Sequence, residues 1–140
     1  MNNNRLLISK YGKDIANVRE CSTAWEIGIG LIGEKQKAAA TGELYQGIYL
    51  RIPSWRRKYS GFINSIHMIG MKYPIAAFWV FENIVVDKVL AVPGFHIYSP
   101  SHAASGVIEL PEQALSDLNI GELISISYVN PPQNSQAGSE

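Results

Sequence analysis

The sequence is poor in cysteine, and Cys21 is the only one among 140 residues. A single cysteine excludes an internal disulfide framework, and no spacing of cysteine and histidine typical of a metal site is present. A chain of this length can bury a hydrophobic core without such cross-links. The sequence therefore predicts a fold that needs no metal and no cofactor, and it fits a reducing compartment such as the cytoplasm.

Charged residues are also scarce, at 17% of the chain against 46% for hydrophobic residues. Lys+Arg 12 and Asp+Glu 12 give a formal net charge of +0, so no overall field attracts nucleic acid, an anionic membrane or an acidic partner. A surface this lean in charge favours burial against a second copy or another protein. We therefore expect a protein partner or self-association, and binding of nucleic acid is disfavoured.

Long apolar runs are absent near the N-terminus. Residues Met1–Arg5 lead into Leu6-Leu7-Ile8, a run too short for the core of a signal peptide or a membrane span. The chain as written is expected to be soluble and cytoplasmic, without membrane insertion. We expect a single β-rich globular domain over residues 1–129, because residues 130–140 form a polar tail without apolar periodicity.

Motifs of common enzymes are absent as well. Gly28, Gly30 and Gly33 spell Gly-x-Gly-x-x-Gly, but they lie inside a predicted helix and not in a turn between a strand and a helix, which argues against a dinucleotide site. No Gly-x-Ser-x-Gly segment occurs, and nothing places an orienting carboxylate beside Cys21 and a histidine. The favoured hypothesis is a protein without catalytic activity, and catalysis stays an open alternative.

What the sequence does contain is a series of short β-prone segments separated by turns. Thr23 and Glu26 have the spacing of a capping box that starts a short helix, and Pro111 can open a second helix over Glu112–Leu118. These patterns predict a mainly β (α+β) fold, a small barrel-like or sandwich domain of about eight short strands with two short helices. The predicted strands are Arg5–Lys10, Ile15–Glu20, Leu44–Ile52, Phe62–Met68, Ile75–Phe81, Ile84–Leu90, Gly106–Leu110 and Glu122–Val129.

The longest apolar segment predicts the centre of the sheet. Ile75–Phe81 alternates poorly between apolar and polar residues, which is typical of a strand buried on both faces. Only Glu82 and Asn83 separate it from Ile84–Leu90, so the two strands are predicted to form a hairpin.

Four separated segments carry a family resemblance, and together they span roughly Val18 to Ile126. They are Thr23 to Gly33, Ser65 to Ile75, Gly106 to Pro111 and Leu118 to Glu122. In this order they resemble the bacterial and archaeal family catalogued as domain of unknown function 192. The resemblance implies a compact, β-rich, barrel-like domain, and it implies no activity because the family has no established biochemical function.

The chain departs from that family in two ways. Many relatives carry export signals, which this chain lacks as written. Relatives also usually place an aspartate directly after the Pro-Ile pair, where this chain has Ala76. If that carboxylate belongs to a family site, this chain has lost it.

The stretch from Ser65 to Pro74 holds a candidate ligand or rim site formed by Ser65, His67 and Lys72. In the predicted strand His67 points to the opposite face from its neighbours Ile66 and Met68. It is a candidate proton carrier or ligand contact, since histidine titrates near neutrality. The alternative is a histidine held by backbone hydrogen bonds at the rim of the barrel.

Other candidate ligands are better explained by structure. Met68 and Met71 fit core packing better than soft-metal binding. His96 and His102 share a loop without acidic or thiolate partners, so they are predicted to be solvated.

One cluster of the sequence is both basic and aromatic. Such side chains can stack on bases while neutralising phosphates, but the zero net charge and the lack of a nucleic-acid motif argue against that role. Aromatic residues and arginine also dominate protein interfaces, and a merely solvated loop is the third interpretation. This candidate interface or nucleic-acid patch consists of Arg51, Trp55, Arg56, Arg57, Lys58 and Tyr59.

Taken together, these patterns favour a non-enzymatic binding or protein-interaction module of an uncharacterised family, with self-association as one form of that role. The alternative is a small-molecule binding protein or enzyme with its site around Ser65, His67 and Lys72. A pocket into which His67 and a second polar side chain both project would favour the alternative.

Overall fold

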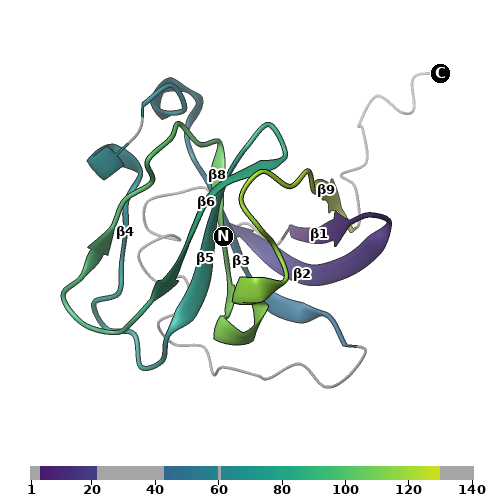
Figure 1. The fold of residues 1–140 in the computed structure, drawn as a ribbon, viewed down its shortest axis with the longest axis horizontal. Coiled ribbons are helices and arrows are strands. Elements are labelled where there is room, and N and C mark those ends of the chain that lie inside the picture. The colour runs from purple at the N-terminus through teal and green to yellow at the C-terminus, as the bar shows by residue number, and fades with distance from the viewer. Residues whose placement is uncertain (1–3, 22–42, 60, 130–140) are drawn as a thin grey trace.

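The fold is a mostly β domain, seen here in a computed structural model that describes residues 4–21, 43–59 and 61–129. The helix predicted from Thr23 lies outside the described residues. Within them the chain forms nine strands and three short 3-10 helices (Figure 1). The strands are β1 Arg5–Lys10, β2 Lys13–Cys21, β3 Tyr45–Arg51, β4 Ile66–His67, β5 Ile75–Phe81, β6 Ile84–Ala91, β7 Ile97–Tyr98, β8 Gly106–Pro111 and β9 Ser125–Tyr128, and the helices are η1 Ser54–Arg56, η2 Gly61–Asn64 and η3 Glu112–Ser116.

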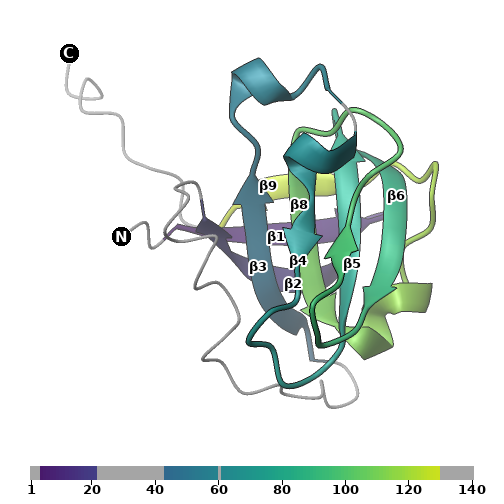
Figure 2. The same cartoon turned by 90° about the vertical axis from the view of Figure 1, so that its left-hand side faces the viewer.

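Seven of these strands form one sheet in the order β6-β5-β8-β3-β2-β1-β9, which curls into a half-barrel (Figure 2). Its strands pair antiparallel except β2 and β3, which run parallel. The short strands β4 and β7 form a separate two-stranded sheet. The predicted β-rich, barrel-like fold class is confirmed.

Tight turns explain where the hairpins fall. Glu82 and Asn83 both have positive φ, at 49° and 67°, which is the conformation that joins two antiparallel strands by a two-residue loop. Tyr11 and Gly12 do the same between β1 and β2, at 53° and 78°. The hairpin predicted between β5 and β6 is therefore confirmed.

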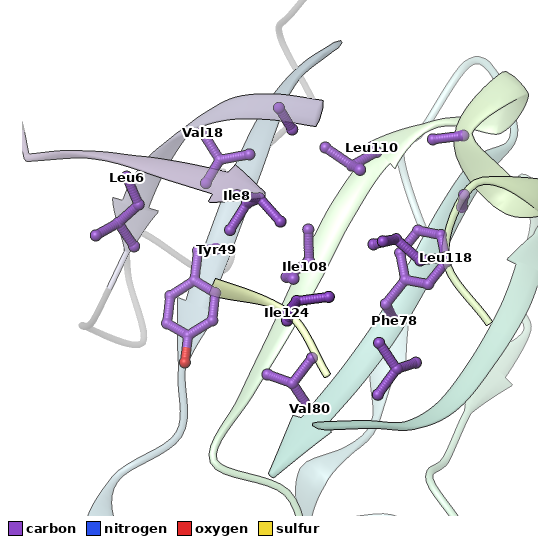
Figure 3. Packing of buried hydrophobic residues seen from close by; sticks show 14 residues of the cluster. Leu6, Ile8, Val18, Tyr49, Phe78, Val80, Ile108, Leu110, Leu118 and Ile124 are labelled. Atoms are coloured by element: carbon purple, nitrogen blue, oxygen red, sulfur yellow. The ribbon is translucent and has the colours of Figure 1, made fainter. Parts of the chain in front are cut away.

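The sheet is buried on both faces, and each face has its own core. Along β5, Ala76, Phe78 and Val80 point into the curl of the sheet, where side chains from β1, β2, β8 and the segment after η3 meet them (Figure 3). Ile75, Ala77 and Trp79 point to the other face, where Ile66 and Met68 of the β4 region cover them. The predicted burial of β5 on both faces is confirmed. Its predicted place at the centre of the sheet is wrong, because β5 lies second from the β6 edge of the seven strands.

Two predicted elements differ from the structure. The strand predicted over Phe62–Met68 is the 3-10 helix η2 followed by the two residues of β4. Gly61 has φ 81°, and the Asn64 side chain donates to two carbonyls of the preceding loop, so the chain curls before it can extend.

The helix predicted over Glu112–Leu118 is the 3-10 helix η3, which ends at Ser116. The helix is short because lysine side chains, and not backbone N–H groups, donate to the carbonyls at its end. Lys88 Nζ donates to the carbonyls of Leu115 and Leu118, and Lys10 Nζ donates to that of Asp117. These side chains take the place of the backbone donors that a longer helix would supply.

No helix in the described ranges is long and apolar enough to cross a membrane.

Candidate functional site

The candidate rim site lies on the exposed side of the two-stranded sheet formed by β4 and β7. His67 pairs with Ile97 across that sheet and is exposed, while Ile66 and Met68 on either side of it are buried. The predicted orientation of His67 is thus confirmed. Its Nδ1 accepts a hydrogen bond from the backbone N–H of Ile69 at 3.3 Å, as a histidine with a structural role would.

The two other candidate residues, Ser65 and Lys72, make no hydrogen bond to His67. The hydroxyl oxygen of Ser65 is 2.6 Å from that of Ser99, and Lys72 is exposed. No hydrogen bond or ion pair links Ser65, His67 and Lys72 to one another in the part of the chain that the structure describes. The structure therefore does not join these three residues into a catalytic arrangement.

The basic and aromatic loop, by contrast, presents its aromatic rings to solvent. Trp55 is 63% exposed and Tyr59 is 46% exposed, although both are large apolar side chains. The guanidinium of Arg56 lies 5.9 Å from the centre of the Trp55 ring, and Lys58 Nζ lies 5.4 Å from that of Tyr59. In Figure 2 this loop, with η1, stands beyond the end of β3 at one end of the molecule.

A buried amide holds this loop in place. Asn64 is 2% exposed, and its Nδ2 donates to the backbone carbonyls of Arg56 at 3.1 Å and Tyr59 at 3.0 Å. Its Oδ1 accepts from Arg56 Nε at 3.2 Å, and Arg57 Nε donates to the Ile52 carbonyl at 2.9 Å. The backbone oxygen of Asn64 accepts from Trp79 in the core, so the exposed loop is tied to the buried sheet.

The structure places Arg51 in a different environment from the rest of its sequence cluster. Arg51 forms an ion pair with Glu20, a buried residue of β2, and its Nε lies 2.9 Å from the Glu20 carboxylate. Arg51 Nη2 also donates to the Tyr128 hydroxyl of β9 at 3.3 Å. Arg51 is close to Trp55 in the sequence, but its charge is neutralised by Glu20 of the half-barrel. Arg51 therefore does not add to the positive charge of the Trp55 loop.

The signal for this ion pair was present in the sequence. Glu20 continues the alternation of Ala16 and Val18 on the core face of β2, so an acid stands where an apolar residue is expected. A buried carboxylate calls for a cationic partner, but only the parallel pairing of β2 with β3 brings Arg51 close.

Next to this ion pair, Tyr49 packs into the core against a glycine. Burial raises the pKa of the Tyr49 hydroxyl, and the nearby Arg51 charge works against that rise. A Cβ added at Gly106 would lie 2.2 Å from the Tyr49 hydroxyl oxygen, so only glycine leaves room for the ring.

A second buried glutamate was also missed. Glu109 of β8 is 8% exposed, and its cross-strand neighbours are Ile48 and Ala77, which offer no hydrogen-bond donor from their side chains. Burial raises the pKa of Glu109 from 4.5 to about 7. Its position inside the run Gly106–Pro111, which is apolar apart from this acid, was the available signal.

The remaining candidate residues are either buried in the core or exposed to solvent. Cys21 is buried and accepts a weak hydrogen bond from Arg19 Nη1, with 3.4 Å between nitrogen and sulfur. Met68 is buried in the core, and His96 and His102 are exposed, as predicted. No group of three metal-ligating side chains lies together among the described residues.

No family model matches the chain, and no curated protein matches it. Two solved structures are similar in fold. One is a candidate transcription regulator from Sinorhizobium meliloti 1021, with a TM-score of 0.67 and 14% sequence identity over 88% of this chain and 92% of that chain. The other is a protein of unknown function from Novosphingobium aromaticivorans DSM 12444, with a TM-score of 0.67 and 12% identity over 86% of this chain and 83% of that chain. At these identities the likeness shows a shared fold, and the resemblance to domain of unknown function 192 stays a prediction.

Proposed function

We propose that this chain is a non-enzymatic protein-interaction module whose contact surface is the loop Ser54–Tyr59. The observation that carries the proposal is the exposure of Trp55 and Tyr59 on a loop whose backbone is fixed from below by Asn64. Exposed tryptophan and tyrosine on a fixed backbone bind with little loss of conformational entropy, which is why they dominate the energetics of interfaces.

The charge of the loop indicates the chemistry of the partner. Arg56, Arg57 and Lys58 are consecutive, and the loop contains no acidic residue. Arg56 and Arg57 each use Nε to hold the loop, which leaves the outer nitrogens of both guanidinium groups available to a partner. We therefore infer that the partner is a protein segment with carboxylates beside an apolar or aromatic side chain.

The small-molecule alternative at Ser65, His67 and Lys72 has less support. Ser65 is hydrogen-bonded to Ser99 and His67 to the backbone of Ile69, and among the described residues no such bond joins either of them to Lys72. Its test is a titration of His67 by NMR with candidate ligands, and a saturable shift of the His67 ring signals that is lost in Ser65→Ala would favour it.

The predicted membership of the family catalogued as domain of unknown function 192 is a further proposal. It is supported by the order of the four matching segments in the sequence and by the mostly β half-barrel. A profile built from homologues of this chain tests it, and alignment of those homologues to a different family contradicts it.

The interaction proposal is tested with the double variant Trp55→Ala/Lys58→Ala. This pair removes the more exposed of the loop's two rings and a cation while leaving the Arg56–Asn64 hydrogen bond intact. Truncating a central tryptophan costs about 2 kcal/mol or more, so we expect at least a roughly 30-fold loss of affinity for the partner identified by crosslinking in the native cell, or of self-association measured by sedimentation.

The matched control is Tyr11→Ala/Lys13→Ala, which removes an even more exposed aromatic residue and a cation from the β1–β2 turn. The control should keep the partner. Equal binding by wild type and the Trp55 variant contradicts the proposal, and so does salt-sensitive binding to duplex DNA that the Trp55 variant loses while its protein contacts persist.

A further inference from the structure

The seven-stranded sheet ends in two edge strands, β6 and β9, and their outward-facing backbone groups are used differently. On β6 the backbone amides of Val85, Lys88 and Val92 each donate to a carbonyl, a carboxylate or a hydroxyl oxygen of another residue. An edge whose donors are already engaged offers little to a further strand. The β6 edge is therefore protected by the protein's own groups.

The outward-facing backbone of β9 belongs to Ile126 and Tyr128. The N–H of Val129 donates to the Arg5 carbonyl of β1, and antiparallel pairing engages every second residue of a strand. The N–H and C=O groups of Ile126 and Tyr128 therefore point away from β1. On the same side, the N–H of Ile124 donates to the turn between β5 and β6, but in the described ranges no strand pairs with the edge beyond it.

The sequence of β9 also lacks the features that protect an exposed edge. The segment Leu123–Val129 contains no charged residue and no proline, and serines alternate with apolar or aromatic residues around Ile126. Natural edge strands usually carry lysine, proline or a bulge that prevents pairing with another chain. In Figure 1, β9 lies at the margin of the half-barrel, with β1 on one side of it. This edge is therefore suited to receive another strand.

We propose that two copies of this chain pair through β9, so that their two sheets join into one. Since the β6 edge is protected, the open edge of a second copy is again β9, and identical strands paired antiparallel are related by a two-fold axis. The free backbone groups define the register. Ile126 lies opposite the partner's Tyr128 and exchanges both backbone hydrogen bonds with it, and Ser127 lies on the axis opposite the partner's Ser127.

This interface does not include the Ser54–Tyr59 loop, so the two proposals stand or fall separately. The variant Trp55→Ala/Lys58→Ala should keep the pairing through β9. Self-association that persists in Ser127→Lys and is lost in the loop variant belongs to the loop and not to β9.

A disulfide crosslink tests the register directly. In a non-hydrogen-bonded antiparallel pair the Cα atoms are about 4.5 Å apart, within the range that a disulfide can span. We expect Ser127→Cys to form a covalent dimer under mild oxidation, measured by non-reducing electrophoresis and mass spectrometry. Ser125→Cys is the matched control, because it is exposed on the same face of β9 but its two copies would lie roughly 13 Å apart along the strands. Cys21 is common to both variants and is buried.

A charge on the axis should prevent the pairing. Ser127→Lys places two like charges opposite each other while its backbone keeps the pairing with β1, so dimerisation should weaken at least about tenfold. Ser127→Thr, which adds no charge, should leave it unchanged. In wild type, sedimentation should show a dimer as the concentration rises from about 10 μM to about 1 mM, and amide exchange at Ile126 and Tyr128 should slow over the same range.

The wild-type measurements decide the outcome even if a variant folds poorly. A protein that stays monomeric at about 1 mM overturns the proposal. Exchange at Ile126 and Tyr128 that is slow at every concentration also overturns it, because the edge is then covered within one chain. Equal crosslinking of Ser125→Cys and Ser127→Cys, or growth into open-ended assemblies, would mean that β9 does not pair with itself in this register.

Discussion

Two glutamates are buried in this sheet, and their surroundings differ in charge. Glu20 faces the curl of the sheet and is paired with Arg51 and Tyr128. Glu109 faces the other side, where only apolar side chains flank it. The ion pair of Glu20 offsets the desolvation of its charge, whereas burial of Glu109 favours the neutral, protonated form. The two residues should therefore respond differently to pH.

Glu109 should make the protein less stable as pH rises from 4.5 to about 7. Its pKa is raised in the folded chain from 4.5 to about 7, so the folded state binds a proton that the unfolded state has released between these values. The free energy of unfolding should then fall by roughly 1.4 kcal/mol per pH unit in that window, or roughly 3 kcal/mol in total. Urea unfolding of wild type and Glu109→Gln from pH 5 to pH 8 measures this difference.

The amide of Glu109→Gln cannot ionise, so its unfolding curve should lack this slope while Glu112→Gln keeps it. Because other groups contribute to the pH dependence of both proteins, the quantity compared is the difference between the curves. Parallel curves for wild type and Glu109→Gln across this window would show that Glu109 is ionised at neutrality and has a partner.

Among the elements, the segment from η1 to β4 shows how one buried side chain can shape a loop. Asn64 donates to the carbonyls of Arg56 and Tyr59, and the Arg56 carbonyl also accepts from the backbone N–H of Tyr59. The 3-10 turns are closed by backbone bonds from Arg56, Arg57 and Tyr59 to residues three positions earlier. The exposed rings of the proposed interface are thus set on a backbone that is fixed before binding.

Asn64→Ala should release this loop and destabilise the domain by about 3 kcal/mol, because three hydrogen bonds are lost, one of them to the Tyr59 carbonyl. Urea unfolding gives the change in stability, and Gln113→Ala, an exposed amide on η3, is the control. Amide exchange at Arg56, Arg57 and Tyr59 should accelerate in Asn64→Ala more than exchange in β5. Unchanged exchange at these three amides would mean that the loop holds its shape without Asn64.

The elements also show what sequence reasoning can and cannot reach. The hairpin of β5 and β6 was predictable, because its turn residues adopt a conformation set by local chemistry and its strands are defined by local apolar patterns. The segment Phe62–Met68 has the same apolar character, yet its path is decided by Asn64, whose hydrogen-bond partners lie five and eight residues away. A pattern method detects apolar character but not such side-chain bonds.

At the scale of the molecule, the residues that matter most come together from distant parts of the chain. The cluster around Glu20 joins β2, β3 and β9, and Tyr128 is 108 residues from its carboxylate partner. Sequence proximity assigned Arg51 to the loop of Trp55, and only the parallel contact of β2 with β3 reveals its ion pair. The sequence could indicate properties of single residues, such as the exposure of Trp55 and the direction of the His67 side chain. It could not indicate which charges pair, such as Arg51 with Glu20.

Contacts between distant parts of the chain also close the half-barrel. Its edge strands β6 and β9 do not pair as strands, and the segment from η3 to Leu123 spans the space between them. Backbone hydrogen bonds join this segment to Val85, and two lysines from different strands bind it. Lys88 of β6 donates to the carbonyls of Leu115 and Leu118 and to Asn119, and Lys10 of β1 donates to the carbonyl of Asp117 and pairs with Glu122.

Removing both lysines should open this closure. Lys10→Met and Lys88→Met keep the aliphatic stems and each should cost about 1–2 kcal/mol in the free energy of unfolding, because carbonyls of one short segment lose a charged donor. The double variant should lose up to about 1 kcal/mol more than the sum, since either lysine alone still fixes the same segment and only the loss of both frees it.

Amide exchange at Val85, Gly121 and Ile124, whose N–H groups bond across the closure, should accelerate sharply in the double variant and little in the single ones. Lys13→Met, at the exposed start of β2, controls for the loss of a surface charge. Strict additivity together with unchanged exchange at these amides would show that the half-barrel closes through its apolar core alone, with Leu118 and Ile124 sufficient to hold the segment in place.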